Sequence, residues 1–389
     1  MISRITLAAL VSCTLSVSAQ QKAPTKPKSS QPAVAKLDPA MGTNTKAAAD
    51  LIWHDVTKWG VEGRGWGDQE RKRWFDRLPA KAEGKVPSPV WSLSRDSSGM
   101  MVRFKTNSPS IHAKYKLMKS TVGMPHMPAT GVSGLDLYAR DDQGKWKWVQ
   151  VTKPTAQTVE QKIISGLAPG EREYAAYLPL YNGIESLEIG VEKGTKFEGL
   201  KPRSEKPVVF YGTSITHGAC ASRPGMVHTS ILGRRLDRPV INLGFSGNGK
   251  MDASVGDLLI ELDPAVYVID CLPNMNATLV SERTVPLVKQ LRAAKPNTPI
   301  VLVEDRRFSN DWITPEKHQF HTDNHAALTK AYEQLKAVGI TGLHYIKGDA
   351  LYGTDSEGST DASHANDLGF MRQSDIFEPV LREALQKAE

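Results

Sequence analysis

The sequence predicts an α/β domain with a five-stranded parallel sheet, preceded by an all-β, jelly-roll-like sandwich. Three observations lead to this fold class. The chain has 389 residues, which is more than one average domain contains. Between about 50 and 200, short runs alternate apolar and polar residues, whereas from about 206 onward the runs are continuously apolar and alternate with helical segments. We therefore expect the sandwich to span 47–203 and the α/β domain 204–389.

The first residues have the form of a secretory signal peptide, 1–19. Arg4 provides a positive start, an apolar stretch follows, and Val17-Ser18-Ala19 fits cleavage between small residues. The apolar stretch has about 15 residues, fewer than the roughly 20 of a transmembrane helix. We expect an exported protein, periplasmic or extracellular, without a transmembrane segment. An alternative is a lipobox at Leu10–Cys13, in which Cys13 would carry a lipid anchor.

Residues 20–46 are expected to form a flexible linker. They are rich in Pro, Lys, Ala, Ser and Gln, a composition that cannot bury a core.

The expected sandwich strands alternate apolar and polar side chains with a period of two. This alternation indicates antiparallel strands with one buried and one solvated face. Seven of the eight tryptophans lie between Trp53 and Trp148, and most of them should fill the core. Trp59 and Trp66 are better ligand candidates because they lie in a glycine-rich stretch, and exposed tryptophans can stack on sugar rings. The runs that we interpret as strands are 101–104, 111–115, 135–138, 146–151 and 187–191.

The second half contains five continuously apolar runs, a pattern typical of parallel strands covered by helices on both faces. The expected strands are 208–211, 240–243, 266–270, 300–303 and 343–346. The expected helices are 225–236, 253–262, 280–295, 324–338 and one that starts near 371.

Groups that acyl transfer requires follow these strands. In an open parallel sheet, functional groups gather beyond the carboxyl ends of the strands. A serine on a turn that enters a helix can serve as a nucleophile. A glycine amide and an asparagine side chain can stabilise an oxyanion, and a histidine with an aspartate three residues earlier can act as an oriented base. The segments concerned are Gly212-Thr213-Ser214-Ile215, Gly244-Phe245-Ser246-Gly247, Leu272-Pro273-Asn274-Met275 and Asp361-Ala362-Ser363-His364.

These four segments, in this order, resemble the sequence blocks of the SGNH/GDSL hydrolase family over about 206–389. The resemblance implies an SGNH-type α/β/α sandwich with a catalytic triad of Ser214, His364 and Asp361. It also implies an oxyanion hole made by the amides of Ser214 and Gly247 and the side chain of Asn274. The family's Gly-Asp-Ser-Leu is Gly-Thr-Ser-Ile here, and Gly-x-Asn-Asp is replaced by Leu-Pro-Asn-Met.

Other residues compete for roles at this site. His217, Arg306 and Trp312 are candidate substrate-binding residues, and Ser246 is a rival nucleophile. Asp349 and Asp355 are rivals of Asp361. The spacing of His318, His321 and His325 allows one helical face, but no glutamate intervenes as in a zinc-protease motif, so we expect no metal.

Cys220 and Cys271 form either a disulfide, as an oxidising compartment favours, or two separate buried thiols. The net charge of +7 includes no dense basic run with interleaved aromatic residues, so the sequence does not indicate nucleic-acid binding. We expect no cofactor, and the sequence does not fix an oligomeric state.

The resemblance extends to family members with a β-sandwich in front of the hydrolase domain, several of which are carbohydrate acetyl esterases. The sequence therefore predicts a secreted serine esterase that removes short acyl groups from an acylated carbohydrate or another small ester. Three alternatives stay open: a lipase, thioesterase or lysophospholipase; acyl transfer to a sugar; and a glycan-binding module with an inactive hydrolase domain.

Overall fold

The computed structural model of the chain describes residue 38 and residues 50–386. The expected signal peptide, the lipobox at Cys13 and, apart from Asp38, the expected linker lie outside the described residues. The chain divides into two compact units, Met1–Gly42 and Thr43–Glu389, and every described helix and strand belongs to the second.

Two antiparallel sheets form the predicted sandwich. Strands from both sheets contribute to one apolar cluster, in which Phe104 from one sheet and Tyr115 from the other are almost fully buried. The first sheet has the order β1 (Leu51–Asp55), β8 (Ile184–Glu192), β3 (Ser110–Leu117), β6 (Thr158–Ser165). The second has the order β5 (Trp146–Val151), β4 (Asp136–Arg140), β7 (Arg172–Tyr177), β2 (Met101–Thr106), β9 (Phe197–Leu200).

The predicted five-stranded parallel sheet is also confirmed. Its order is β11 (Val240–Gly244), β10 (Val208–Gly212), β12 (Val266–Asp270), β13 (Ile300–Val303), β14 (Leu343–Ile346), and every neighbouring pair is parallel. The chain runs from β10 outward to β11 and then crosses to β12 on the other side. This reversal is a topological switch point, where doubly wound sheets place their binding sites.

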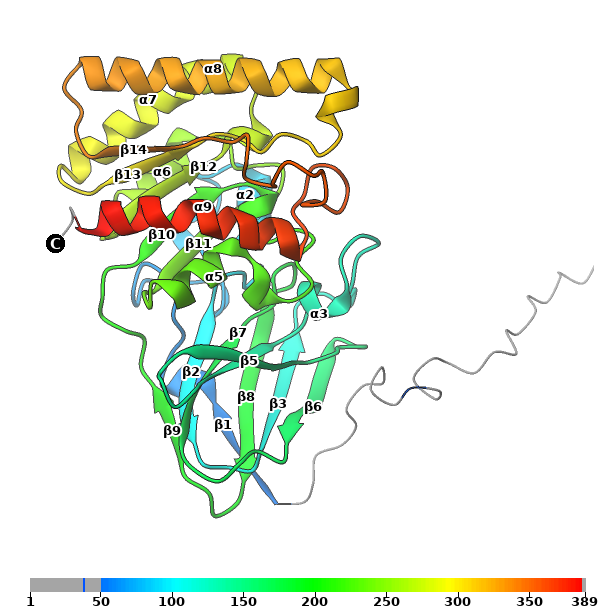
Figure 1. Ribbon diagram of the computed structural model, residues 1–389. Helices are drawn as coiled ribbons and strands as arrows, with labels where there is room; N and C mark the ends of the chain where they lie inside the picture. Colours follow the sequence, from blue (N-terminus) through cyan, green and yellow to red (C-terminus); the bar gives the residue numbers. More distant parts are fainter. Residues whose placement is uncertain (1–37, 39–49, 387–389) are drawn as a thin grey trace, which may run out of the picture. The chain divides into compact units, whose positions relative to one another are not determined.

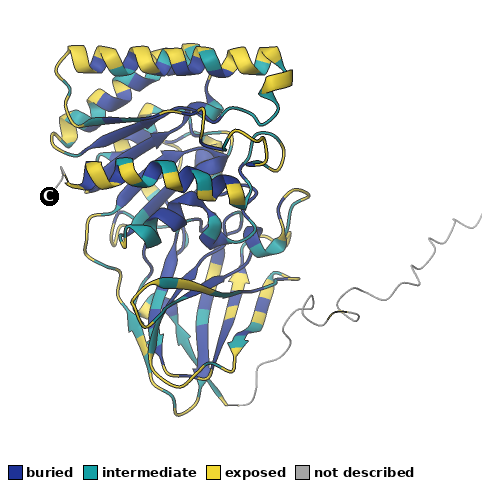
Figure 2. Cartoon of the chain, in the orientation of Figure 1, coloured by how far each residue is buried: buried dark blue, intermediate teal, exposed yellow. Residues whose placement is uncertain are grey.

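Helices cover both faces of this sheet (Figure 1). Because successive strand residues point to opposite faces, Val209 and Tyr211 pack with α6–α8, whereas Val208 and Phe210 pack with α5 and α9. Strands and inner helix faces are buried, while the outer faces of α8 and α9 are exposed (Figure 2). The helices are α2 (Ser88–Leu93), α3 (Ala129–Val132), α4 (Ser214–His217), α5 (His228–Arg235), α6 (Ala253–Leu259), α7 (Ala277–Ala294), α8 (Pro315–Ala337) and α9 (Asp367–Gln386). Short 3-10 turns are η2 (Val56–Lys58), η3 (Ala80–Ala82), η4 (Pro224–Met226), η5 (Leu272–Asn274) and η6 (Asp311–Ile313).

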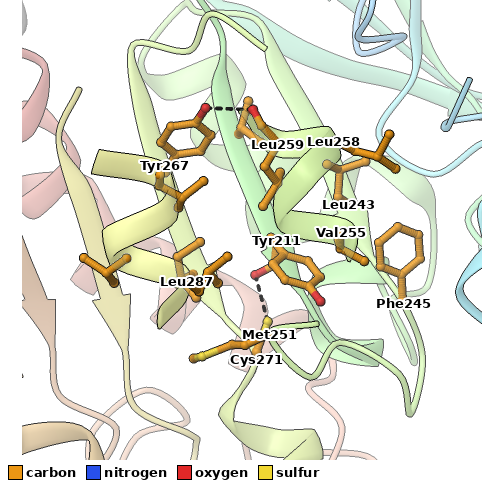
Figure 3. Close-up of a cluster of buried hydrophobic side chains, with 14 of the residues drawn as sticks. Tyr211, Leu243, Phe245, Met251, Val255, Leu258, Leu259, Tyr267, Cys271 and Leu287 are labelled. Carbon is orange, nitrogen blue, oxygen red and sulfur yellow. Dashed lines mark hydrogen bonds between the residues drawn. The ribbon is translucent and has the colours of Figure 1, made fainter. Parts of the chain in front are cut away.

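Two tyrosines belong to the apolar cluster on the face of the parallel sheet that α6–α8 cover (Figure 3). Tyr211 and Tyr267 are fully buried, and the Tyr267 hydroxyl donates to the carbonyl of Leu259 at 2.8 Å. A buried hydroxyl needs such a partner, so this bond fixes the end of α6 against β12.

The segment between β1 and β2 packs against the parallel sheet, although it lies within the range expected for the sandwich. Leu78 and Val90 belong to the apolar cluster that contains Tyr211 and Leu243. The buried Arg77 guanidinium donates to the carbonyls of Asn242 and Gly244 at 3.1 and 2.8 Å. These bonds saturate carbonyls at the outer edge of β11, where no sixth strand is present among the described residues.

No described helix is both long and apolar enough to cross a membrane.

Candidate active site

Ser214 is the first residue of α4 and follows β10 by two residues. The Thr213 side chain accepts a hydrogen bond from the amide of Ile215, which caps the helix. The helix has only four residues because Gly218 ends it at a positive φ of 109°, a conformation that favours glycine. The Ser214 Oγ lies 2.9 Å from Nε2 of His364.

His364 and Asp361 lie in the loop that precedes α9. Nδ1 of His364 is 2.7 Å from Oδ2 of Asp361, and Oδ1 of Asp361 accepts the backbone amides of His364 and Ser363 at 2.7 and 3.0 Å. Burial acts to raise the pKa of Asp361, but these hydrogen bonds outweigh it, and the pKa is lowered from its ordinary value. The carboxylate therefore stays ionised and can orient the imidazole towards Ser214.

The two rival aspartates point elsewhere. Asp355 forms two bonds with the Arg372 guanidinium, at 2.6 and 2.7 Å, and Asp349 is 2.6 Å from Arg307. Of the three candidates, only Asp361 contacts His364.

The expected oxyanion donors follow β11 and β12, beside Ser214. Oδ1 of Asn274, at the end of η5, accepts the amide of Gly249 at 3.2 Å, so its Nδ2 is left to donate. Gly247 is exposed, and no atom lies within 4 Å of where its Cβ would be, so its backbone is open to a ligand. Gly249 is different: a Cβ there would lie 2.0 Å from the carbonyl oxygen of Gly212, so this position requires glycine.

Comparisons with known proteins show to which family this fold belongs. Residues 205–382 match the GDSL-like lipase/acylhydrolase family, and residues 51–197 match the N-terminal domain of SGNH-hydrolase-type esterases that is named GxDLY. A candidate GDSL-like lipase from Bacteroides ovatus shares 32% sequence identity with this chain. Its crystal structure matches with a TM-score of 0.82, and the match covers 87% of this chain and 98% of that one. The chain belongs to the GDSL-like lipase/acylhydrolase family.

Solved structures with lower sequence identity share the fold of this chain. A salicylyl acyltransferase from a tetracycline biosynthetic pathway is 21% identical, with a TM-score of 0.68 over 87% of this chain and 98% of that one. An acetyl xylan esterase from the rumen bacterium Butyrivibrio proteoclasticus is 10% identical, with a TM-score of 0.53 over 88% of this chain and all of that one. No curated protein sequence matches the chain.

Two expected substrate contacts are corrected by the structure. His217 is fully buried, with Nε2 2.7 Å from the carbonyl of Leu180 and its ring stacked on Tyr181. Burial holds the pKa of His217 well below its ordinary value, so it is a neutral core histidine.

Arg306 is likewise turned inward and is only 2% exposed. Its guanidinium pairs with Asp270, with one contact of 2.9 Å, and donates to Gln373 at 2.8 Å. Asp270 in turn accepts the hydroxyl of Thr216, on α4, at 3.1 Å. Arg306 therefore supports α4, the helix that begins with Ser214, through Asp270 and is not available to a substrate.

Trp312 is 74% exposed and lines a groove of about 400 Å³ beside the loop that carries Asp361 and His364. The groove reaches that loop through Ser309, whose amide donates to the carbonyl of Ala362 at 2.9 Å. The groove contacts the same loop through Tyr352, whose hydroxyl donates to the carbonyl of Ser363 at 2.7 Å. This position is compatible with the expected substrate contact.

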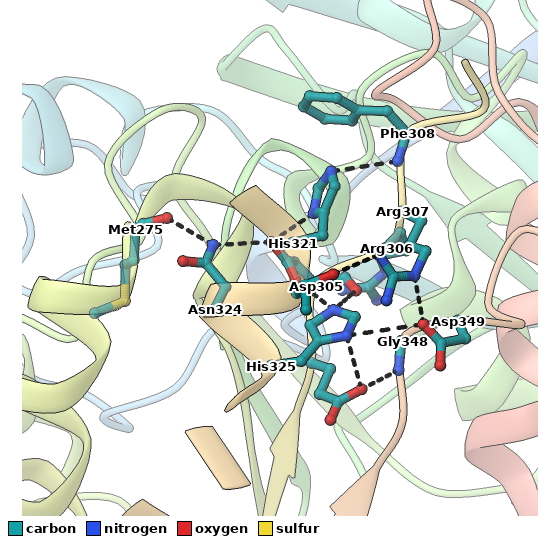
Figure 4. Close-up of polar contacts among 12 residues, drawn as sticks. Met275, Asp305, Arg306, Arg307, Phe308, His321, Asn324, His325, Gly348 and Asp349 are labelled. Atoms are coloured by element: carbon teal, nitrogen blue, oxygen red, sulfur yellow. Dashed lines mark hydrogen bonds and ion pairs between the residues drawn. The ribbon is translucent and has the colours of Figure 1, made fainter. Parts of the chain in front are cut away.

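The predicted histidine cluster divides. His318 is exposed and contacts Asp311, whereas His321 and His325 are buried around Asp305 (Figure 4). These three buried groups are close enough to surround a cation. However, Nε2 of His321 accepts the amide of Phe308, so Nδ1 carries the proton and donates to Asp305. The protonated Nδ1 cannot ligate a metal, and the cluster functions as a hydrogen-bond network.

The Asp305→Asn substitution should destabilise the fold by about 3 kcal/mol near neutral pH, because it leaves buried partners unpaired. Burial acts to raise the pKa of Asp305, but hydrogen bonds from His321 and His325 hold it at about 2. The stabilisation is complete above the unfolded pKa of about 4 and is lost as the pH falls towards 2. Urea denaturation at pH 6 and pH 3 should therefore show a smaller difference from wild type at pH 3. The exposed Asp323→Asn is the control, and a pH-independent difference would contradict the assignment.

Sequence reasoning missed three sandwich residues that support the site. The Tyr181 hydroxyl donates to the carbonyl of Ser214 at 3.4 Å, and the His126 ring centre lies 6.5 Å from that of His364. Asp136, in Gly134–Tyr138, is fully buried and binds the Arg223 side chain and the Gly225 amide at 3.0 and 2.7 Å. The sequence signal for Asp136 was an aspartate between two leucines, at the start of the run Asp136–Arg140.

The two cysteines that the structure describes do not form a disulfide. Cys220 and Cys271 are both free and buried, which decides between the two alternatives. Burial and the nearby Asp361 charge raise the pKa of the Cys220 thiol to about 11, so it stays protonated beside Asp361.

Proposed function

We propose that this protein is an exported carboxyl ester hydrolase that removes acetyl or other short acyl groups from a carbohydrate. The observation that carries the proposal is the continuous hydrogen-bonded path from Ser214 through His364 to Asp361. Export is supported by the signal-like residues 1–19.

In the proposed mechanism, the Ser214 Oγ attacks the ester carbonyl while Nε2 of His364 takes its proton. The tetrahedral oxyanion receives hydrogen bonds from the amides of Ser214 and Gly247 and from Nδ2 of Asn274. His364 then protonates the leaving alcohol as the acyl-enzyme forms. A water molecule, deprotonated by His364, attacks the acyl-enzyme, and the proton returns to Ser214 as the carboxylic acid leaves. Asp361 keeps Nδ1 protonated and stabilises the imidazolium in both halves.

The groove that Trp312 lines favours a carbohydrate as the alcohol part of the ester substrate. Apart from Phe308, Trp312 and Tyr352, it is lined by polar residues and one glycine. Side chains such as Ser309, Thr354 and Ser356 can exchange hydrogen bonds with sugar hydroxyls, and the exposed Trp312 ring can stack on a sugar face. A long acyl chain would instead need an apolar channel. An acetyl xylan esterase shares the fold and acts on an acylated carbohydrate, as proposed here.

The acyl-chain profile should separate this proposal from a lipase or thioesterase. We expect kcat/KM for p-nitrophenyl esters to fall by at least 100-fold from acetate to palmitate, because the polar groove offers little apolar surface to a long chain. Release of acetate from acetylated xylan, compared with that from Ser214→Ala protein, would then test the carbohydrate. A rate that rises with chain length would favour the lipase alternative. Acyl sugar formation with an added sugar acceptor would indicate transfer instead of hydrolysis.

The Asn274→Ala substitution should lower kcat by about 100- to 1,000-fold with little change in KM, because the lost hydrogen bond matters mainly in the transition state. Steady-state hydrolysis of p-nitrophenyl acetate measures the effect. Asn276→Ala is a matched control: this neighbouring side chain caps α7 by accepting the Leu279 amide at 3.0 Å. It should lose about 1 kcal/mol of stability and keep its activity. Full activity in Asn274→Ala would remove Asn274 from the oxyanion hole.

A further inference from the structure

A second cavity lies at the opposite end of the parallel sheet from Ser214. It has a volume of about 550 Å³, within the range of small-ligand sites, and we name it the tryptophan cavity because Trp59, Trp66 and Trp74 line it. Pro207 and Pro239, which precede β10 and β11, also line it, whereas Ser214 follows the carboxyl end of β10. At about 3.3 Å per strand residue, the two sites are roughly 20 Å apart.

The indole rings of two of these residues are fixed by hydrogen bonds. Nε1 of Trp59 donates to the carbonyl of Arg103 at 2.9 Å, and Nε1 of Trp66 donates to the carbonyl of Leu258 at 3.2 Å. Trp59 also packs directly over Gly199, where a Cβ would approach its ring to 2.3 Å. Binding to rings held in this way would cost little conformational entropy.

The glycine-rich loop between Trp59 and Trp74 is held equally firmly. The Arg71 guanidinium donates to the carbonyls of Arg64, Gly67 and Gln69 at 2.6, 3.2 and 3.0 Å. Trp66 adopts a positive φ of 50°, which is unfavourable for an aromatic residue and persists only where the surroundings impose it. These contacts therefore fix the backbone conformation of the loop.

The charges around the cavity favour a neutral ligand. Three basic residues (Lys58, Arg64, Arg203) and four acidic residues (Glu62, Asp68, Glu205, Asp263) line it. Arg203 is paired with Glu62 at 2.8 Å, and Asp263 is paired with Lys206 at 3.0 Å, so two basic and two acidic residues remain. Neither an anion nor a cation would gain a net attraction, whereas hydroxyl groups can both donate to carboxylates and accept from guanidinium groups.

We propose that the tryptophan cavity binds a neutral sugar unit of a glycan chain. A pyranose combines an apolar C–H face, which packs on an indole ring, with a rim of hydroxyl groups, and the cavity offers partners for both. Trp74 lines the cavity and is only partly buried, and the Arg64 guanidinium lies over its ring, 4.4 Å from the ring centre, so a sugar would contact the part of the ring that Arg64 leaves uncovered. The inference shares only the ligand class, a carbohydrate, with the proposed function.

The test is calorimetric titration of the Ser214→Ala protein with unacylated xylohexaose, cellohexaose and chitohexaose. Because no ester is involved, the result does not depend on catalytic activity. We expect saturable binding of at least one neutral hexasaccharide, weakened at least tenfold by Trp74→Ala and about fivefold by Asp68→Ala. Asp68 is exposed, so its replacement carries little risk of unfolding.

Trp146→Ala is the matched control, since Arg140 lies over Trp146 at 4.3 Å, as Arg64 does over Trp74. Its affinity should equal that of the parent. The proposal is overturned if no neutral hexasaccharide binds at millimolar concentration, or if binding survives both cavity substitutions. It is also overturned if tetragalacturonate, an acidic chain, binds more tightly than the neutral ones. A wild-type protein without esterase activity would contradict the proposed function but not the proposal that the tryptophan cavity binds a sugar.

Discussion

Replacing Ser214 with alanine should lower the rate of ester hydrolysis by about 10⁵- to 10⁶-fold. Members of a catalytic triad act as a unit, so removing the nucleophile leaves only the contribution of the oxyanion hole and substrate binding. The nearby Cys220 thiol should not replace the Ser214 Oγ, because it is buried and stays protonated. The measurement is p-nitrophenyl acetate hydrolysis by wild-type and Ser214→Ala protein, together with their thermal unfolding.

The matched control is Ser246→Ala, because Ser246 lies in the loop after β11 and is the rival nucleophile that the sequence offers. We expect this variant to stay within about tenfold of wild type, since His364 contacts Ser214 and no described contact joins it to Ser246. Equal turnover by Ser214→Ala and wild type would show that Ser214 is not the nucleophile. Activity lost in both variants, with unchanged stability, would implicate the loop of Ser246 in the same step.

The parallel sheet could be predicted from the sequence because its strands are buried on both faces. Runs such as Val208–Tyr211 and Ile300–Val303 are continuously apolar, and the observed strands agree to within one residue. The sandwich was predicted less completely. β1, β6, β7 and β9 escaped notice because their residues are mixed or few, as in the sequence Phe197–Leu200. Such strands are defined by the partners with which they pair and not by their own pattern.

The candidate site was predictable where backbone topology alone positions a residue. Ser214, Gly247 and Asn274 follow three adjacent strands of one parallel sheet, so their convergence follows from the strand order. The direction of a side chain does not follow in this way. His217 and Arg306 also lie beyond strand ends, yet both point into the core, because Leu180 and Asp270 offer them buried partners. Those partners are distant in sequence, and no local sequence pattern predicts them.

The sandwich contributes to the site in a way that gives its buried Asp136 a physical explanation. Burial acts to raise the pKa of Asp136, and Arg223 acts against this increase. A buried carboxylate is costly unless it is paired, so the Asp136–Arg223 pair must stay closed in the folded protein. Because Arg223 lies a few residues after α4, this pair ties the first domain to the chain that leaves the nucleophile. The sandwich therefore helps to position Ser214, whatever else it binds.

The Asp361→Asn substitution should lower kcat by about 10⁴-fold at neutral pH while leaving the fold intact. An amide at this position no longer requires His364 to keep its proton on Nδ1, and it cannot stabilise the imidazolium that forms during the reaction. The backbone amides of Ser363 and His364 can still donate to the amide oxygen, so the loop should keep its conformation. The pKa of Asp361 is lowered from its ordinary value, so the wild-type carboxylate is ionised throughout the neutral range. The measurement is kcat for p-nitrophenyl acetate at pH 7, with thermal unfolding as the check on folding.

Asp355→Asn is the control that makes this prediction specific. Asp355 lies six residues earlier, is exposed, and binds Arg372 instead of His364. Its substitution should cost at most about 1 kcal/mol of stability, as expected of a surface ion pair, and should leave kcat within a few-fold of wild type. The opposite result, with Asp355→Asn inactive and Asp361→Asn active, would mean that the loop rearranges in solution and that Asp355 orients the base. If both variants stay active, His364 needs no carboxylate, and the site works as a serine–histidine pair.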